Sequence, residues 1–348
     1  MTRTFGVYAL LVAVCLGMPG VLFAQFSPPG FENALSLQIS PRYPAPNARV
    51  TLTLTSTVFD LSSSDITWFV DGDVQEGSSG SRTMSFQSGS VGRASAVSVV
   101  VKGAEGTAEA NARIIPAEVD LLFEANSFTP PFYAGRAHAS AGSTVTLWAI
   151  PRLVQPGGST IQADQVIYTW RRNGDILGSL SGRGKRSITL PAPLLFGSDS
   201  ISVEATSADK AVGAESTVGV TTRDPELALY REDPRYGVLY EQAFAATSIV
   251  NDQEAVFVVV PYFAPTRRSA DPLLRYQWRI NRTAVQGDGT EPDKITIDAA
   301  NSTGIALIEL VLTHATNYFL EASGRWNITF ERESDLFSPL IPTPGSAF

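Results

Sequence analysis

One seven-residue pattern occurs three times in this chain of 348 residues, and no other feature restricts the fold as much. An aliphatic or aromatic residue is followed two positions later by Trp and, three positions after the Trp, by Asp or Asn. The pattern stands at 66–72 (ITWFVDG), at 168–174 (YTWRRNG) and, without its final Gly, at 276–282 (YQWRINR). The tryptophans occupy positions 68, 170 and 278, and intervals of 102 and 108 residues are the length of a domain. The chain therefore predicts three repeated domains rather than a solenoid of short units.

The segments around each Trp indicate β-strands. Residues 50–55 (VTLTLT) alternate strictly between apolar and polar, and residues 145–150 are their counterpart in the second copy. In the third copy residues 255–260 are apolar on both faces, which predicts a strand that is covered on both sides. No segment after residue 24 carries a sustained apolar stripe of helical period. The fold class predicted is all-β.

The residues after each Trp strand predict hairpins. Asp71-Gly72 and Asn173-Gly174 supply the positive backbone φ that a two-residue hairpin turn requires. In the third copy Asn281-Arg282 lacks the glycine, so a longer loop is expected there.

The Trp pattern and the alternating strands resemble the immunoglobulin-like and PKD-like domains of bacterial surface proteins, over most of residues 34 to 332. The resemblance implies three tandem antiparallel β-sandwich domains. Pro116 and Asp224-Pro225 mark the boundaries, which predicts domains at 34–116, 117–223 and 225–332, followed by an irregular tail at 333–348.

The first 24 residues are typical of an export signal, with Arg3 before an apolar centre and Ala24 before the expected cut. Residues 5–24 are long enough to span a bilayer, so a cleaved signal peptide and a retained anchor both stay open. Residues 25–33 are interpreted as a Pro-containing linker. The single cysteine, Cys15, lies inside the signal, and domains without disulfides favour a bacterial exported protein. The location expected is the periplasm, the cell surface or the medium.

Catalytic patterns are not found in the sequence. His138 and His314 lie 176 residues apart in different predicted domains, and no phosphate loop, nucleophile elbow or zinc-protease motif occurs. We expect no enzyme activity and no cofactor. The net charge of −8 argues against nucleic acid as a partner, because phosphate binding needs clustered Lys and Arg.

Calcium is left open as a ligand. Asp71 with Asp73, and Asp224 with Glu226, are the carboxylate pairs near turns or boundaries, although Asp also serves turns by bonding nearby amides.

Aromatic residues give the candidate sites. Trp68, Trp170 and Trp278 are expected to fill the sandwich cores, whereas Trp148 faces away from its apolar neighbours and is expected at an interface or surface. Further candidates for contact with a protein or glycan are Phe128, Phe132, Tyr133, Tyr236 and Tyr240. The alternative is that these rings cap the ends of the sandwiches.

These features together predict a non-catalytic structural or adhesive protein of the bacterial envelope or surface, which spaces and presents a protein- or glycan-binding face. The alternatives are a membrane-anchored component of a pilus or secretion apparatus, touching the membrane only through residues 5–24, and accessory domains of a carbohydrate-active protein. Function is expected in the loops where the copies differ most: 124–142, 151–165, 231–253 and 261–274.

Overall fold

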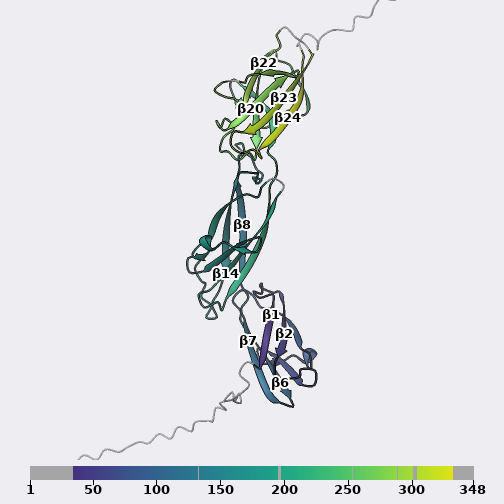
Figure 1. Cartoon of the computed structure of the whole chain (residues 1–348), viewed down its shortest axis with the longest axis vertical. Helices are drawn as coiled ribbons and strands as arrows, with labels where there is room; N and C mark the ends of the chain where they lie inside the picture. The colour runs from purple at the N-terminus through teal and green to yellow at the C-terminus, as the bar shows by residue number, and fades with distance from the viewer. Residues whose placement is uncertain are drawn as a thin grey trace, which may run out of the picture. The chain divides into compact units, whose positions relative to one another are not determined.

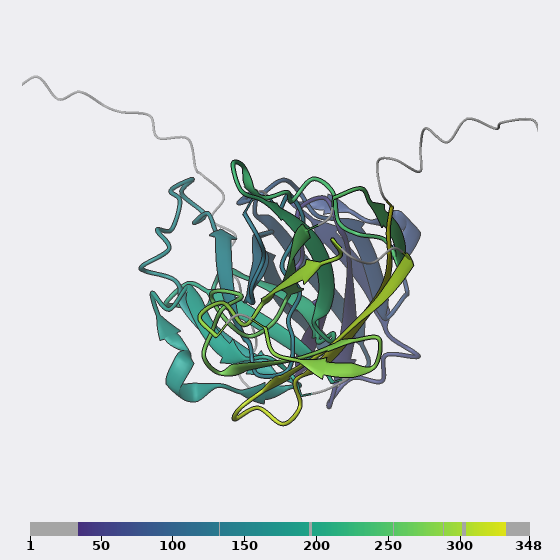
Figure 2. The same ribbon diagram turned by 90° about the horizontal axis from the view of Figure 1, so that it is seen from above.

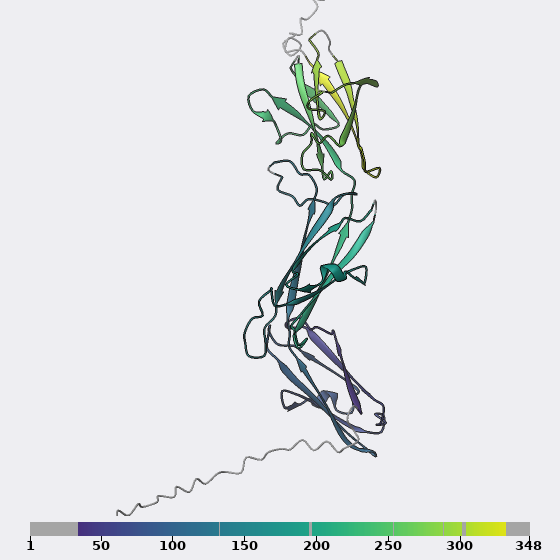
Figure 3. The same ribbon diagram turned by 60° about the vertical axis from the view of Figure 1, so that its left-hand side comes forward.

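The computed structural model describes residues 34–331 except 132, 195–196, 253, 288 and 301–303. These residues form strands, loops and two single-turn 3-10 helices, η1 (Glu76–Ser78) and η2 (Gly178–Leu180) (Figure 1, Figure 2, Figure 3). No helix in this described part is long and apolar enough to cross a membrane. The predicted signal segment, the linker, the tail and Phe132 lie outside the described residues.

The chain divides into two compact units. The first unit comprises residues 34–38, 52–84 and 96–112, and the second comprises 39–51, 85–95 and everything described from 113 onward.

The first seven strands form a three-stranded sheet in the order β1-β2-β5 and a four-stranded sheet in the order β4-β3-β6-β7. Buried side chains of the first unit come from both sheets, among them Leu52 and Met84 on one and Trp68 and Val99 on the other. The strands are β1 (Leu35–Ser40), β2 (Arg49–Ser56), β3 (Asp65–Val70), β4 (Asp73–Val74), β5 (Thr83–Gln87), β6 (Ser95–Gly103) and β7 (Gly106–Ile114).

In the second unit, the next eight strands repeat this arrangement. One sheet has the order β13-β9-β8, and the other has the order β11-β10-β14-β15 with β12 paired to β10. A single apolar core joins the two sheets, with Leu147 of β9 on one side and Trp170 of β10 on the other. The strands are β8 (Glu118–Asn126), β9 (Thr144–Arg152), β10 (Ile167–Arg172), β11 (Asp175–Ile176), β12 (Gly182–Arg183), β13 (Ser187–Pro191), β14 (Ser198–Thr206) and β15 (Gly213–Thr221).

The last nine strands form the third pair of sheets, in the orders β17-β16-β19-β22 and β18-β24-β23-β20-β21. Among the described residues these strands pair in antiparallel fashion, except that β18 pairs with β24 in parallel. The strands are β16 (Glu226–Asp233), β17 (Gly237–Val238), β18 (Thr247–Val250), β19 (Glu254–Tyr262), β20 (Leu274–Ile280), β21 (Thr283–Val285), β22 (Lys294–Asp298), β23 (Gly304–His314) and β24 (Glu321–Phe330).

The same connectivity thus occurs three times. The strand that carries the repeated Trp shares one sheet with the last two long strands of its copy. The first two long strands share the other sheet with β5, β13 or β22. This is the immunoglobulin-like arrangement of two facing sheets, and the predicted fold class is confirmed: the chain is all-β, with three tandem sandwiches. The predicted domain boundaries stay a prediction.

Each repeated Trp is buried and bonded in the same way. Trp68 and Trp170 have no exposed surface and Trp278 is 2% exposed. Their indole Nε1 atoms donate to the carbonyl oxygens of Ser81 (2.8 Å), Lys185 (2.8 Å) and Pro292 (3.0 Å). In every copy that acceptor lies two residues before the start of β5, β13 or β22. The indole therefore fills the core and also fixes the entry of the strand opposite.

The turns after the Trp strands are also equivalent, and here one prediction is wrong. Asp71, Asn173 and Asn281 all have positive φ, and each side-chain oxygen accepts a backbone N–H of the neighbouring strand at 2.7–2.9 Å. The third hairpin has no longer loop, because Ile280 pairs directly with Thr283. Asn281 and Arg282 both adopt positive φ, so the two-residue turn forms without glycine.

Strand β19 is covered on both faces. Phe257 and Val259 belong to the core between the sheets, while Val258 and Val260, which point the other way, are also buried. Tyr230 of β16 stands opposite Val258 in the pairing and is itself buried. The sequence prediction of a strand covered on both sides is confirmed.

Candidate functional site

Two loops of the second unit meet at the ends of β8 and β19. The backbone N–H of Phe128 donates to the carbonyl of Ala264 (2.8 Å), and the N–H of Phe263 donates to the carbonyl of Phe128 (2.7 Å). Phe263 is only 4% exposed and has a φ of 62°. A bulky residue with positive φ costs free energy. Surrounding contacts must therefore hold this backbone in place.

Those contacts come from an aromatic cluster, defined here as Tyr133, His138, Tyr262 and Phe263. The Phe263 ring lies 4.7 Å from His138, 5.8 Å from Tyr133 and 5.9 Å from Tyr262, measured between ring centres. Tyr133 and Tyr262 approach to 5.7 Å. All four contacts are edge-to-face, the geometry that aromatic rings prefer. The cluster thus joins the loop after β8 to the end of β19.

Further tyrosines extend the cluster over the outer face of β16 and β19. The Tyr230 and Tyr262 hydroxyls lie 2.6 Å apart, and the rings of Tyr230 and Tyr240 are 5.5 Å apart. Burial, and secondly the hydrogen bond with Tyr230, raises the pKa of Tyr262 above its usual value, and burial raises the pKa of Tyr240. Tyr240 and Tyr262 therefore stay neutral at physiological pH. Together with Tyr230 they act as packing and hydrogen-bonding groups.

A third link joins the loop after β23 to the loop before β9. The Asn317 side-chain Nδ2 donates to the carbonyl of Ala141 (2.7 Å). Next to it, Gly142 has a φ of 91°, and a Cβ at this position would stand 2.3 Å from Asn317 Nδ2. His314 Nδ1 accepts the backbone N–H of Asn317 (3.0 Å) and so orients this loop. Glycine at position 142 is required for both its backbone angle and this close approach.

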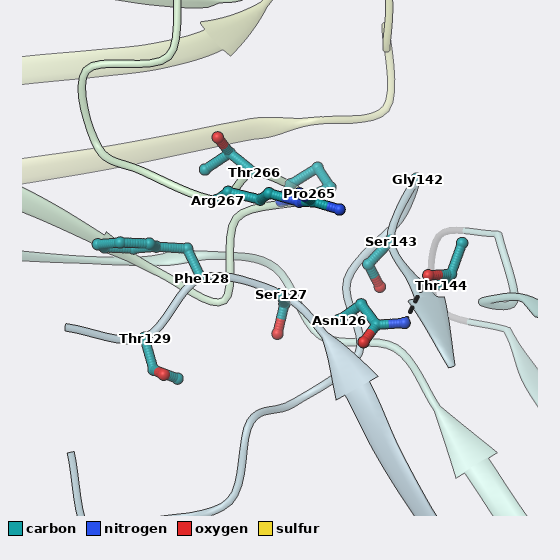
Figure 4. A pocket seen from close by; sticks show the side chains of 10 residues that line it. All are labelled: Asn126, Ser127, Phe128, Thr129, Gly142, Ser143, Thr144, Pro265, Thr266 and Arg267. Atoms are coloured by element: carbon teal, nitrogen blue, oxygen red, sulfur yellow. Dashed lines mark hydrogen bonds between the residues drawn. The ribbon is translucent and has the colours of Figure 1, made fainter. Parts of the chain in front are cut away.

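Next to these links lies a groove of about 610 Å³, called the junction groove below (Figure 4). Its volume is within the range of about 300–1,000 Å³ that is usual for ligand pockets. Polar side chains and backbone make up most of its lining, which consists of Asn126, Ser127, Phe128, Thr129, Gly142, Ser143, Thr144, Pro265, Thr266 and Arg267.

Most hydroxyl groups of the junction groove already have partners in the protein. Ser143 Oγ donates to the carbonyl of Ser140 (2.8 Å), and Thr266 Oγ1 bonds Asp271 (2.7 Å). The amide of Asn126 donates to the Thr144 and Thr146 hydroxyls at 2.8 and 3.1 Å. Arg267 differs, because its guanidinium forms no ion pair within the described residues. The groove can therefore offer a ligand the Arg267 cation, the side-chain oxygen of Asn126 and the Phe128 ring.

The residues singled out from the sequence lie in several places. Tyr133 is half-buried in the aromatic cluster and Tyr240 is half-buried against Tyr230, whereas Tyr236 is 80% exposed in the turn after β16. Trp148 is half-buried on the outer face of β9, where it pairs with the exposed Leu122. Only Tyr133 belongs to the aromatic cluster that adjoins the junction groove.

The two histidines are far apart in the sequence but both belong to the links around the groove. His138 packs edge-on against Phe263, and its loop is held by the Ser127 hydroxyl, which donates to the His138 carbonyl at 2.7 Å. His314 uses Nδ1 as a backbone acceptor. Both histidines thus have packing or hydrogen-bonding roles within the described residues.

The structure brings no third metal-ligating side chain to either of the carboxylate pairs considered for calcium, within the described residues. Asp71 accepts the N–H of Ala96 (2.7 Å), and Asp224 and Glu226 are exposed. Within the described residues, no group of three or more His, Cys, Asp or Glu side chains is arranged to hold a metal ion.

Three residues of this region were not identified from the sequence. Phe263 and Arg267 lie in the loop 261–274, where the copies differ, but neither belongs to a recognisable pattern. Asn317 lies in a short connection between two strands, and only its contact with Ala141 gives it a role.

Comparison with known proteins gives similarities of structure only. No family model matches the chain, and no curated protein matches it. Similar solved structures include three N-terminal domains of the outer capsid protein Hoc of bacteriophage RB49, at 14% identity and a TM-score of 0.25, covering 86% of this chain and 99% of that one.

Two further similar structures cover nearly the same share of this chain. The central fibronectin-III array of RIM-binding protein has 14% identity and a TM-score of 0.30, covering 85% of this chain and 96% of that one. The protein SGBP-B of the Bacteroides ovatus mixed-linkage glucan utilization locus, solved with a heptasaccharide, has 14% identity and a TM-score of 0.24, covering 85% and 70%. Scores this low align no residue of this chain with a functional residue elsewhere, so its function must be argued from its own geometry.

Proposed function

We propose that this chain is a non-catalytic, exported spacer and interaction protein of a bacterial envelope. In this proposal the second and third sandwiches act as one presenting unit, and the junction groove lies on its binding face.

The observation that carries the proposal is the set of links around the junction groove. Relative motion is the default for neighbouring domains joined by a small, polar interface. Here the backbone hydrogen bonds of Phe128, the aromatic cluster and the Asn317–Ala141 bond all oppose such motion. A spacer that presents a binding face gains affinity from this kind of preorganisation.

The bonding of the groove's polar groups supports a binding role over a catalytic one. General acid–base catalysis needs a proton-transferring side chain within hydrogen-bond reach of the substrate. The ten residues that line the groove include no His, Asp or Glu, and the hydroxyls of Ser143 and Thr266 are occupied by protein partners.

Export and the envelope location rest on the N-terminal residues 1–24. The apolar stretch 5–24 also favours a second candidate, an anchored component of an envelope assembly such as a pilus or secretion apparatus. Fractionation of the producing cells, with N-terminal sequencing of the recovered protein, separates the two. A mature chain that begins near Gln25 in the periplasm or medium supports the free spacer, and an intact Arg3 in the membrane supports the anchored form. Cytoplasmic recovery of the intact chain contradicts export.

The presenting unit is tested by distance measurements between spin labels. The mature chain contains no cysteine if residues 1–24 are removed, so Thr217→Cys and Ala284→Cys would introduce two unique, exposed labelling sites in the second and third sandwiches. A narrow distance distribution is expected, and it should broaden when Asn317→Ala and Phe263→Ala are added. The matched control is Tyr236→Ala, which removes an exposed ring outside the aromatic cluster. A distribution that is already broad in the unmodified chain refutes the presenting unit.

A further inference from the structure

A loop with two exposed rings follows β23. Tyr318 is 92% exposed and Phe319 is 54% exposed, although the next residue, Leu320, is buried in a small core with Leu274 and Leu312. Single exposed apolar residues are common, but two adjacent aromatic rings on one loop mark an interaction surface. Residues 315–320 are called the aromatic loop below.

The aromatic loop is held in one conformation by its own hydrogen bonds. His314 Nδ1 accepts the N–H groups of Thr316 (3.2 Å) and Asn317 (3.0 Å), and Asn317 Oδ1 accepts the N–H of Phe319 (3.2 Å). The N–H of Leu320 donates to the carbonyl of Asn317 (3.1 Å). The rings are therefore exposed by an ordered backbone, and little conformational entropy is left to lose when a ligand binds.

The aromatic loop also borders the junction groove. Asn317 Nδ2 bonds the carbonyl of Ala141 and stands against Gly142, which lines the groove. Arg267 also lines the groove, and in Figure 4 its side chain extends in the direction of Gly142. An extended ligand in the groove would thus meet a cation, amide and hydroxyl groups, and then the rings of Tyr318 and Phe319.

This combination of groups selects the class of ligand. Aromatic faces carry partial negative charge and attract the C–H faces of sugar rings, while amide and hydroxyl groups bond sugar hydroxyls. A guanidinium binds a carboxylate through two parallel hydrogen bonds. A nucleic acid would need several clustered cations, whereas the groove lining contains one, Arg267.

We propose that the junction groove and the aromatic loop together bind an acidic polysaccharide, with Arg267 pairing with a sugar carboxylate and Tyr318 and Phe319 stacking on neighbouring sugar rings. The proposal rests on the binding role proposed above and names the ligand class for it.

Calorimetric titration of the full mature chain tests the proposal with two matched probes, an oligogalacturonate and its methyl ester, which has the same rings without the negative charge. The acid is expected to bind, and the ester to bind about tenfold more weakly. Arg267→Gln should weaken binding of the acid about tenfold and leave the ester unchanged. Tyr318→Ala with Phe319→Ala should weaken both probes about tenfold.

Tyr236→Ala is the control for the loss of an exposed ring elsewhere, and it should change neither affinity. Equal binding of acid and ester overturns the assignment of an acidic ligand, and so does an Arg267→Gln variant with unchanged affinity for the acid. If neither the acid nor the ester binds, and an oligoalginate as a second acidic chain does not bind either, the site as a whole is overturned. In that case a narrow spin-label distance distribution would leave the presenting unit intact, so the two failures can be told apart.

Discussion

The hairpins with the repeated tryptophans occur in all three sandwiches. The loops around the junction groove, by contrast, occur once among the described residues. In all three copies an indole donates to a carbonyl two residues before the facing strand, and the Asp or Asn oxygen of the turn accepts an N–H of the neighbouring strand. The aromatic cluster and the aromatic loop occur once among the described residues. The repeated features close each sandwich core, whereas the features that occur once join two sandwiches and border the proposed binding site.

The largest effect is expected from removing a repeated indole. In fragment 117–223, which the predicted boundaries define, Trp170→Ala should lower the free energy of unfolding by about 3–5 kcal/mol, because a fully buried ring is lost. Urea denaturation measures the change. Trp148→Ala is the matched control, since Trp148 is half-buried on an outer face, and it should cost distinctly less. Equal costs would contradict the core role, and a fragment that does not melt cooperatively would contradict the boundaries.

A smaller effect is expected at the junction. Phe263→Ala in the mature chain should separate the thermal transitions of the second and third sandwiches and cost about 3 kcal/mol, because the ring links Tyr133, His138 and Tyr262. Scanning calorimetry detects the separation. Phe263→Gly removes the same ring but also relieves the positive φ, so it should cost less than the alanine variant. Two transitions that are already separate in the unmodified chain would show that the ring does not couple the sandwiches.

The turn residues should give a still smaller effect. Asn281→Ala loses the acceptor for the Leu307 N–H and places alanine at a φ of 49°, which together should cost about 1–2 kcal/mol. Asn281→Gly loses only the acceptor and should cost about half as much. Hydrogen exchange of the Leu307 amide reports the local change. If Asn281→Ala and Asn281→Gly lower the stability equally, the positive φ at this position adds nothing to the cost of the alanine substitution.

The repeated features could be predicted from the sequence, whereas the features that occur once could not. Alternation in residues 50–55 and the turn residues Asp71 and Asn173 predicted strands and hairpins, because local periodicity and positive φ leave direct marks in the sequence. The longer loop expected at Asn281-Arg282 was wrong because it relied on a missing glycine, whereas Asn tolerates the same backbone angle. Asn317 and Phe263 left no such mark. Their roles depend on contacts with residues about 130 to 180 positions away, which no local pattern encodes.

The smallest predicted effect depends on pH and concerns Glu204, which is engaged by residues distant in the sequence. Tyr43 donates to it at 2.5 Å and Arg171 at 3.0 Å. Burial alone would raise the pKa of Glu204, but these two hydrogen bonds bring it below its usual value of about 4.5; burial and the bond to Glu204 raise the pKa of Tyr43 to about 12.

Since the folded-state pKa of Glu204 lies below the unfolded one, its contribution to stability is complete above pH 4.5 and is lost as the pH falls through the folded value. Glu204→Gln should therefore destabilise the mature chain by no more than about 1 kcal/mol at pH 7. The difference from the unmodified chain should shrink as the pH falls below about 4, as measured by urea denaturation. Tyr43→Phe removes one of the two hydrogen bonds, so its loss of stability should follow the same pH trend but be smaller. If the loss of stability in Glu204→Gln is the same at every pH, the Glu204 carboxylate contributes packing alone.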